Sequence, residues 1–156
     1  FIGSPKMNLM PAQVTAVDEL GVTLEVGTPS QPHSVRAAVA AHASQALEVG
    51  SMVTLGIRAE HWREVHTGPD VFQGHITMVE HLGESNMLYL TLDNGCEVVA
   101  RGDGNRPVQV GAAISLSVAA DAFHVFDAQG RAFKRLRPGN MVAAGRVAPP
   151  AVERAT

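Results

Sequence analysis

An internal repeat constrains the fold of this chain more than any other feature of its sequence. Residues 14–21 (VTAVDELG) align with residues 76–83 (ITMVEHLG), and residues 50–62 (GSMVTLGIRAEHW) align with residues 111–123 (GAAISLSVAADAF). Both alignments have a similar offset along the chain, so one unit follows the other. The sequence therefore predicts two related structural units of about sixty residues each, the size range of a small repeat module.

Each unit has the pattern of short β-strands separated by turns. Apolar and polar residues alternate, and β-branched residues are frequent, in segments 13–17, 22–26, 34–39, 52–57, 76–79, 87–92, 97–100 and 114–118. Gly21 and the Asn94-Gly95 pair mark hairpin turns, because Asn and Gly adopt positive φ at little cost. Helical patterns are confined to short pieces around 32–44 and 119–122. The predicted fold is all-β with a few short helical turns.

Two units of this size fit small five-stranded barrels, which close their sheets and leave few exposed edges. Trp62 and Phe123 occupy matching positions of the repeat, after the last long strand of each unit. We expect each ring to fill the core of its barrel. Cys96 is the single cysteine, so no internal disulfide and no all-cysteine metal site is expected, and its predicted role is packing.

Charge is distributed unevenly along the chain. Residues 1–130 carry six Lys or Arg against fourteen Asp or Glu, and residues 131–156 carry six against one, which gives −8 and +5 and the total of −3. An acidic body with 4% aromatic residues argues against a nucleic-acid groove, which needs cations and stacking rings. Only the basic end keeps a nucleic-acid hypothesis open.

Sequence motifs of catalysis are missing from the chain. It has no phosphate loop, no H-E-x-x-H, no G-x-S-x-G and no kinase signature. The candidate histidine pairs for a metal site lack any recognised ligand spacing, and they are His61 and His66, His75 and His81, and His42 and His124. We therefore expect no catalytic, cofactor-binding or metal-binding residue. Without an apolar stretch of membrane-spanning length or a signal peptide, a soluble intracellular protein is expected.

Four ordered motifs resemble a known family. They are FIGSPKMN (1–8), LGIRAEH (55–61), VEHLGESNMLYL (79–90) and HVFDAQGRAFKRL (124–136). Together they resemble the C-terminal regulatory region, often called the TOBE region, of the ATP-binding subunits of bacterial sugar ABC importers of the maltose and glycerol-phosphate type. Ala59 departs from the family, which commonly has proline at that position.

The resemblance implies a pair of OB-like barrels of the TOBE or MOP type. Residues 1–8 would be a junction to an ATPase domain, 9–136 a regulatory domain with halves 9–66 and 71–136, and 137–156 a flexible basic tail. The implied function is regulation and dimerisation of the ATP-binding subunit of an importer for sugars or sugar-like solutes. The chain is not expected to be an enzyme, and it would bind no cofactor, because ATP and Mg²⁺ belong to the parent's ATPase domain.

The resemblance also carries over signature residues, all expected to be structural. They are Gly3, Ser4, Pro5, Lys6, Met7 and Asn8 at the junction, and Gly56, Arg58, Glu60, His61, Glu80 and Gly83 in the barrels. The two-residue spacing of Arg58 and Glu60 predicts that they share one face of a strand.

Implied partners are the ATPase domain of the same parent chain, transporter membrane subunits, a second copy of the chain and a regulatory protein, at the inner face of the bacterial plasma membrane. An alternative function stays open, namely binding of a small ligand. The ligand would be an oxyanion such as molybdate, or a sugar, since related barrel pairs bind oxyanions between subunits.

Overall fold

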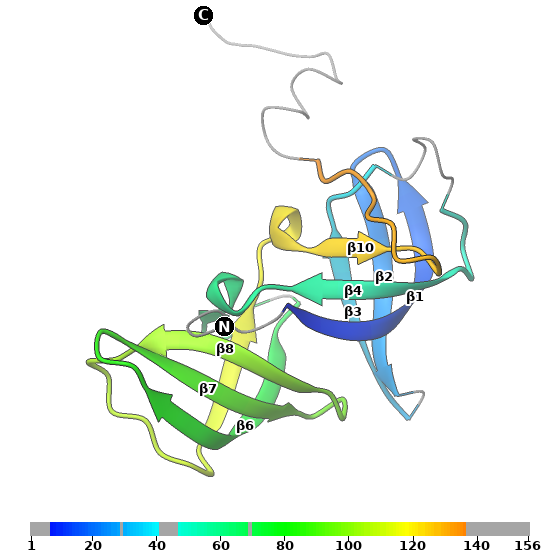
Figure 1. The fold of residues 1–156 in the computed structure, drawn as a ribbon. Coiled ribbons are helices and arrows are strands. Elements are labelled where there is room, and N and C mark those ends of the chain that lie inside the picture. Colours follow the sequence, from blue (N-terminus) through cyan, green and yellow to red (C-terminus); the bar gives the residue numbers. More distant parts are fainter. Residues whose placement is uncertain (1–6, 29, 41–46, 69, 137–156) are drawn as a thin grey trace, which may run out of the picture.

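The structure is a computed structural model that describes residues 7–28, 30–40, 47–68 and 70–136. The described residues form two curled five-stranded sheets that lie against each other (Figure 1). The strands are β1 (Asn8–Asp18), β2 (Gly21–Thr28), β3 (Gln31–Ala37), β4 (Met52–Ile57), β5 (Arg63–Glu64), β6 (Phe72–His81), β7 (Ser85–Leu92), β8 (Glu97–Asp103), β9 (Ala113–Ser117) and β10 (His124–Phe126). Two 3₁₀-helices, η1 (Ala59–His61) and η2 (Ala120–Ala122), follow β4 and β9.

The two sheets have the same strand order when each strand of the first unit is matched with its counterpart in the second. The first sheet has the order β10-β4-β1-β2-β3 and the second β5-β9-β6-β7-β8, with antiparallel pairing throughout. Thus β1 corresponds to β6, β2 to β7, β3 to β8, β4 to β9 and β10 to β5. The predicted all-β fold of two related five-stranded units is confirmed.

The repeat extends to single hydrogen bonds. The register of β1 against β2 shifts at Thr15, and the register of β6 against β7 shifts at the aligned residue, Thr77. The Thr15 hydroxyl donates to the carbonyl of Thr23 at 3.2 Å, and the Thr77 hydroxyl donates to that of Tyr89 at 3.0 Å. Each bulge bends its long strand, which helps a short sheet to curl towards closure.

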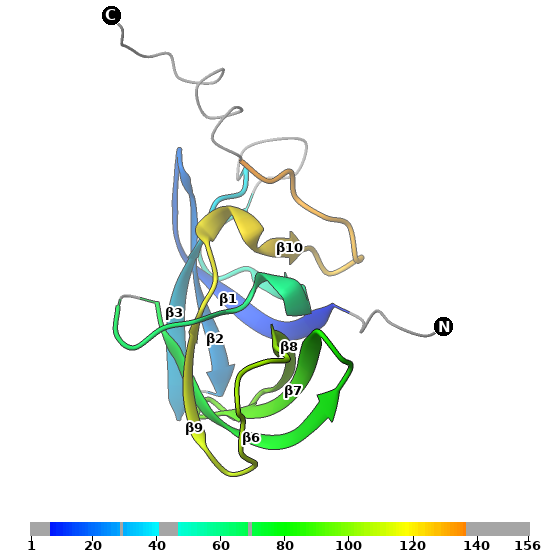
Figure 2. The ribbon, with the colours of Figure 1, turned by 90° about the vertical axis from the view of Figure 1, so that its left-hand side faces the viewer.

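The two units exchange their closing strands. Strand β5 follows the first unit in sequence but pairs with β9 of the second sheet, through Arg63–Ser117 and Glu64–Leu116. Strand β10 follows the second unit but pairs with β4 of the first sheet. In Figure 1 the yellow β10 lies beside the teal β4, and Figure 2 shows the chain running from β9 through η2 to reach it. Each unit therefore completes the sheet of the other.

This exchange changes the boundaries of the units. The predicted halves, 9–66 and 71–136, do not coincide with the two sheets, because residues 63–64 and residues 124–126 each lie in the opposite sheet. Strands of two and three residues are too short for an alternating pattern, so no sequence signal marked them.

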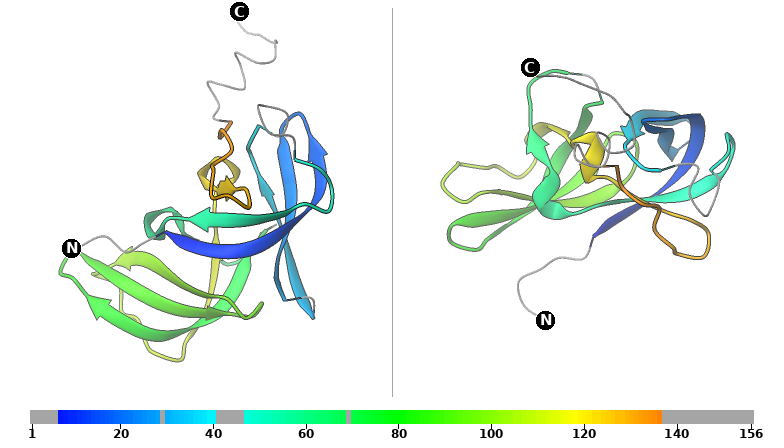
Figure 3. Two further views of the ribbon diagram at one scale, coloured as in Figure 1. Left: turned by 45° about the vertical axis from the view of Figure 1, so that its right-hand side comes forward. Right: turned by 90° about the horizontal axis from the view of Figure 1, so that it is seen from above.

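One continuous apolar core lies between and inside the sheets. It includes Val14, Leu24 and Leu55 from the first sheet and Leu90 and Leu116 from the second. The left view of Figure 3 shows the two sheets curling around this region.

Both predicted aromatic core residues are buried, with Trp62 3% exposed and Phe123 1% exposed. Trp62 comes from the first unit but packs edge-on against Phe72 of β6, with ring centroids 5.2 Å apart. Its ring therefore contacts the core of the second sheet, following the strand exchange.

Two local predictions differ in outcome. The helix predicted around 32–44 is wrong for residues 32–37, which belong to β3, where Val35 and Ala37 point inward and Ser34 outward. Residues 41–46 of that segment lie outside the described residues. The helical turn predicted at 119–122 is confirmed by η2.

The predicted junction and tail are largely outside the described residues. Residues 1–6 and 137–156 fall there, whereas Asn8 is the first residue of β1. In the described ranges, no helix is long and apolar enough to cross a membrane.

The exchange predicts that the two sheets unfold together. Val125 of β10 is fully buried, and Val125→Ala should lower the free energy of unfolding by about 2 kcal/mol, because buried methyl groups are lost and a cavity remains. In urea, the fluorescence of Trp62 and the amide signals of β1 should report one transition with the same lower midpoint. Val110→Ala, at a side chain that is 64% exposed, serves as the control. Two separate transitions, with that of Trp62 unmoved, would contradict the exchange.

Candidate functional site

The side chain of Asn8 joins the first sheet to the edge of the second. Its Nδ2 donates to the carbonyls of Ile57 at 3.0 Å and Val99 at 2.8 Å, and its Oδ1 accepts from the Val99 N–H at 2.8 Å. Val99 lies on β8, the outer strand of the second sheet. The amide thus bonds to both backbone groups of an edge residue, as a neighbouring strand would, and covers part of that edge. Asn8 itself is 9% exposed.

Gly56 provides space for two side chains at the same junction. A Cβ atom at this position would overlap Sδ of Met7 and lie 2.9 Å from Cε2 of Phe126. Gly56 pairs with Leu9 on β1 and with His124 on β10, so it lies in the middle of the first sheet. Two signature residues, Met7 and Gly56, are therefore explained by packing.

The other signature residues of this motif lie around η1. Arg58 precedes η1 with its side chain exposed, Ala59 is 3% exposed, and Glu60 and His61 lie within the helix. The prediction that Arg58 and Glu60 share a strand face is wrong, because β4 ends at Ile57 and the chain turns there. The helix η1 contacts β8, and its counterpart η2 contacts β3.

A cavity of about 270 Å³ lies between η1, η2 and the segment after β10. Its polar lining comprises His61, Arg63, Asp121 and Arg135. Nδ1 of His61 is buried without a hydrogen-bond partner among the described residues. Arg63 donates to the backbone carbonyls of Glu60 at 2.7 Å and Trp62 at 3.1 Å, which fixes its guanidinium at the rim. Two cations against one carboxylate give this cavity a positive character.

Glu80 and Gly83 lie away from the junction, near the turn between β6 and β7. The Tyr89 hydroxyl donates to Glu80 at 3.4 Å, and Gly83 has a φ of +87°, which an L side chain rarely adopts. These two residues shape a hairpin, and the structure therefore divides the signature set into a junction group and a turn group.

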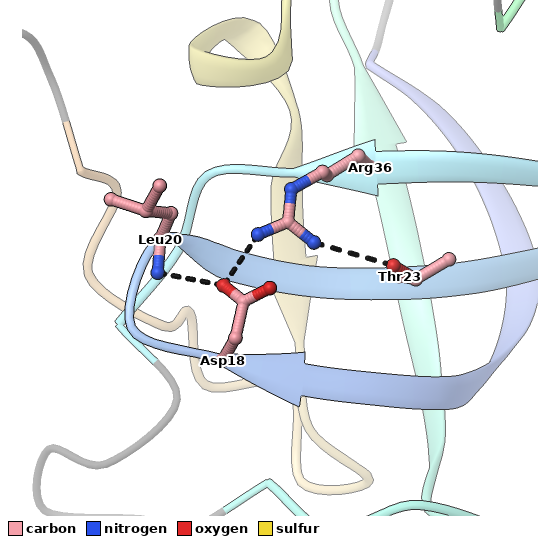
Figure 4. A network of polar contacts seen from close by, with 4 residues as sticks. All are labelled: Asp18, Leu20, Thr23 and Arg36. Carbon is pink, nitrogen blue, oxygen red and sulfur yellow. Dashed lines mark hydrogen bonds and ion pairs between the residues drawn. The ribbon is translucent and has the colours of Figure 1, made fainter.

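The turn between β1 and β2 is the repeat counterpart of the Glu80 turn, and it holds a polar network (Figure 4). Asp18 accepts from the backbone N–H of Leu20 at 2.8 Å and forms an ion pair with Arg36. Arg36 also donates to the hydroxyl of Thr23 at 3.4 Å. The bond from Arg36, followed by that from Leu20, lowers the pKa of Asp18 from its ordinary value.

The pKa of Asp18 gives a pH dependence with a defined sign. Because the folded pKa lies below the unfolded value of about 3.9, the contribution of this contact to stability is present above pH ~4 and is lost as pH falls through the lower folded pKa. In an NMR titration, Arg36→Gln should raise the pKa of Asp18 towards the ordinary value, and added salt should act in the same direction. An unchanged pKa in Arg36→Gln would contradict this assignment.

Metal and thiol chemistry find no support in the described residues. Among them, no three His, Cys, Asp or Glu side chains form a group that could hold a metal ion, and His42 lies outside them. Cys96 packs against the core, and burial raises the pKa of its thiol. A thiol with a raised pKa is a poor nucleophile at neutral pH, which agrees with the predicted packing role.

Two family models match overlapping parts of the chain. The MalK OB fold domain matches residues 3–62, and the TOBE domain matches residues 55–126. Residues 3–62 thus have the sequence pattern of a MalK OB fold domain, and residues 55–126 that of a TOBE domain. The matches overlap at 55–62, which covers the end of β4 and η1, where the chain passes from the first sheet to the second.

Sequence relatives are ATP-binding proteins of sugar import or transport. The maltose/maltodextrin import ATP-binding protein MalK of Vibrio vulnificus is 31% identical over 137 residues, covering 87% of this chain and 35% of that protein. The lactose transport ATP-binding protein LacK of Rhizobium radiobacter is 31% identical over 132 residues, covering 84% of this chain and 35% of that protein. The chain thus spans about a third of the length of these relatives.

A solved structure has the same fold. The cytoplasmic molybdate-binding protein ModG, crystallised with molybdate, matches with a TM-score of 0.63 and 16% identity, over 76% of this chain and 94% of that one. At this identity the likeness concerns the fold alone.

Three residues of the junction region were not identified from the sequence in the roles that they have here. Arg135 lies in the basic run at the end of the last motif, which was an available signal, whereas Arg63 lies two residues after the motif 55–61 without a neighbouring cation. The pairing role of Asn8 had no such signal, because no local pattern marks an asparagine that bonds to a strand ninety-one positions away.

Proposed function

We propose that this chain is the regulatory and dimerisation domain of the ATP-binding subunit of an importer for sugars or sugar-like solutes. The observation that carries the proposal is the alignment of 87% of the chain with ATP-binding subunits for sugar import. In this role it would bind no ATP itself. Its partners would be the ATPase domain of the same parent chain, membrane subunits of the transporter and a regulatory protein, at the inner face of the plasma membrane.

The way in which the two sheets are joined supports such a role. The exchanged strands and the Asn8 amide join the two sheets, and one apolar core runs through both. A rigid body outside a moving ATPase domain, held to its copy, keeps the two ATPase domains at a high effective concentration.

The outer face of the first sheet is the surface that we propose for pairing. Leu9 on β1 is 61% exposed and Met52 on β4 is 62% exposed, and both point away from the core with Pro11 between them. An exposed apolar stripe on a sheet is typical of a surface covered by a partner.

Paired substitutions test this surface. The double variant Leu9→Glu, Met52→Glu should shift the chain from dimer to monomer in sedimentation velocity, because burying two carboxylates opposite their copies is unfavourable. Leu20→Glu, at a turn residue that is 60% exposed, is the matched control and should leave the dimer intact. A wild-type chain that stays monomeric at high concentration would contradict dimerisation. An equal loss of dimer in the double variant and in Leu20→Glu would contradict the assignment of pairing to this surface.

Oxyanion binding is a second candidate function, favoured by the cavity at η1 and η2. Arg63 and Arg135 bring two guanidinium groups to it, and His61 adds a ring nitrogen. Calorimetric titration with molybdate, sulfate and phosphate tests this function. Saturable heats that are lost in Arg63→Gln are expected if the site is used, and flat titrations would remove the candidate.

A further inference from the structure

The ring of His33 is a contact between the two sheets. His33 lies on β3 of the first sheet, and its imidazole lies against the ring of Phe72 on β6 of the second. The ring centroids are 4.3 Å apart and the planes meet at 41°. Phe72 in turn packs edge-on against Trp62, with centroids 5.2 Å apart. Three aromatic rings therefore follow one another where the two sheets meet.

The surroundings of His33 suit a neutral ring. The residue is half-buried, and its Nε2 atom is buried without a hydrogen-bond partner among the described residues. A protonated imidazole carries an N–H on both ring nitrogens and a net charge, all of which need water or an acceptor. At Nε2 the packed ring offers neither. A charged ring therefore gains hydration by leaving Phe72.

Few charged groups lie around His33. Asp70 precedes β6, and Asp93, in the turn after β7, lines the same cavity as His33. On the side of the first sheet, His33 pairs with Val26 of β2, and its own strand has no charged residue before Arg36. Desolvation lowers the pKa of His33 and outweighs the opposing attraction of Asp70. The two carboxylates therefore do not make this position favourable for a cation.

We propose that His33 makes the junction of the two sheets sensitive to acid: when its imidazole takes up a proton, the ring leaves Phe72 and the start of β3 separates from the second sheet. Such a contact would respond in the pH range in which an ordinary histidine becomes charged. The two hairpins could then loosen while each sheet keeps its own strand pairing.

The direction of the pH dependence follows from the two states of the ring. Once it has left Phe72, the ring has the ordinary histidine pKa of about 6.5. The pKa of the packed ring is lower, so the contact contributes fully to stability above about pH 6.5 and loses this contribution as pH falls towards the lower value. One proton is taken up at this site, so the population of the open junction should rise by up to about tenfold per pH unit.

An NMR titration of the 156-residue chain between about pH 8 and about pH 5 tests the opening. The ring signals of His33 should titrate at a lower pH than those of His75, an exposed histidine on β6. Nuclear Overhauser effects between the rings of His33 and Phe72 should fall to about half at the midpoint of the His33 titration, because half of the molecules are then open. Those between Trp62 and Phe72 should persist, since that contact does not involve His33.

A matched pair of variants tests whether His33 is the group responsible. His33→Phe keeps an aromatic ring against Phe72 but cannot take up a proton, so its urea midpoint should fall less than that of wild type on acidification below about pH 6.5. His75→Phe makes the same change at an exposed position and should keep the full pH dependence of wild type. If His33→Phe does not fold, His33→Gln gives the same comparison, because an amide side chain does not titrate.

Three results would overturn the proposal. The first is a titration of His33 at or above the pH at which His75 titrates. The second is a contact between His33 and Phe72 that persists in the protonated form. The third is an equal pH dependence of the urea midpoint in wild type and His33→Phe, which would assign the acid sensitivity to other groups.

Discussion

Asn8→Ala is expected to lower the free energy of unfolding by about 3 kcal/mol, since three hydrogen bonds at a partly buried junction are lost together. The truncation leaves the carbonyls of Ile57 and Val99 and the N–H of Val99 without their partner. Urea unfolding followed by the fluorescence of Trp62 measures the change. Hydrogen exchange at the Val99 amide should also accelerate, because its acceptor is gone.

Two further variants separate the hydrogen bonds from the loss of side-chain volume. Asn8→Asp keeps the acceptor for Val99 but places a carboxylate oxygen against the carbonyls of Ile57 and Val99, so its stability at pH 7 should fall at least as far as that of Asn8→Ala. Asn105→Ala, in an exposed turn, should change stability by less than about 0.5 kcal/mol. A similarly small change in Asn8→Ala would show that the tie between the sheets contributes little.

Gly21→Ala is expected to have the largest effect on stability, roughly 4 kcal/mol or more, and to impair folding. Gly21 has a φ of +142°, and a Cβ atom there would overlap the carbonyl oxygen of Ala37 and lie 3.0 Å from its carbon. Both contacts are with backbone, so relief requires the end of β3 to move away from β2.

The repeat supplies the matched control for this substitution. Gly83 aligns with Gly21 and has a φ of +87°, and a Cβ atom at Gly83 would meet no other atom within 4 Å. Gly83→Ala should therefore cost only the backbone strain, about 1 kcal/mol. Urea midpoints of the two variants give the comparison directly. Equal effects would mean that the contact with Ala37 is relieved without cost.

The long strands were predictable because their side chains alternate between core and surface. In β2, Val22, Leu24 and Val26 are buried at every second position, and this period is visible in the sequence. The repeat was also visible in the sequence, and it predicted that the turns at Gly21 and Gly83 are equivalent. Segment 34–39 had a strand pattern and also fell in the helical piece expected around 32–44, and the strand formed because β2 offers an unpaired edge to residues 31–37.

The candidate sites were less predictable. Gly56 and Asn8 were identified only through the family resemblance, and their contacts with Met7, Phe126 and Val99 come from distant positions. His33 carries no motif at all, and its ring contacts Phe72 only because the start of β3 meets the start of β6.

The sequence by itself determined the two-unit, all-β organisation, since alternation and turn residues are local and are repeated. Only the tertiary structure decided that β5 and β10 exchange sheets. The physical reason is that β4 and β9 occupy equivalent positions and offer similar edges, while two- and three-residue strands carry too little pattern to select one. After η1 and after η2 the chain continues to the opposite sheet. Trp62, which follows η1, packs there against Phe72.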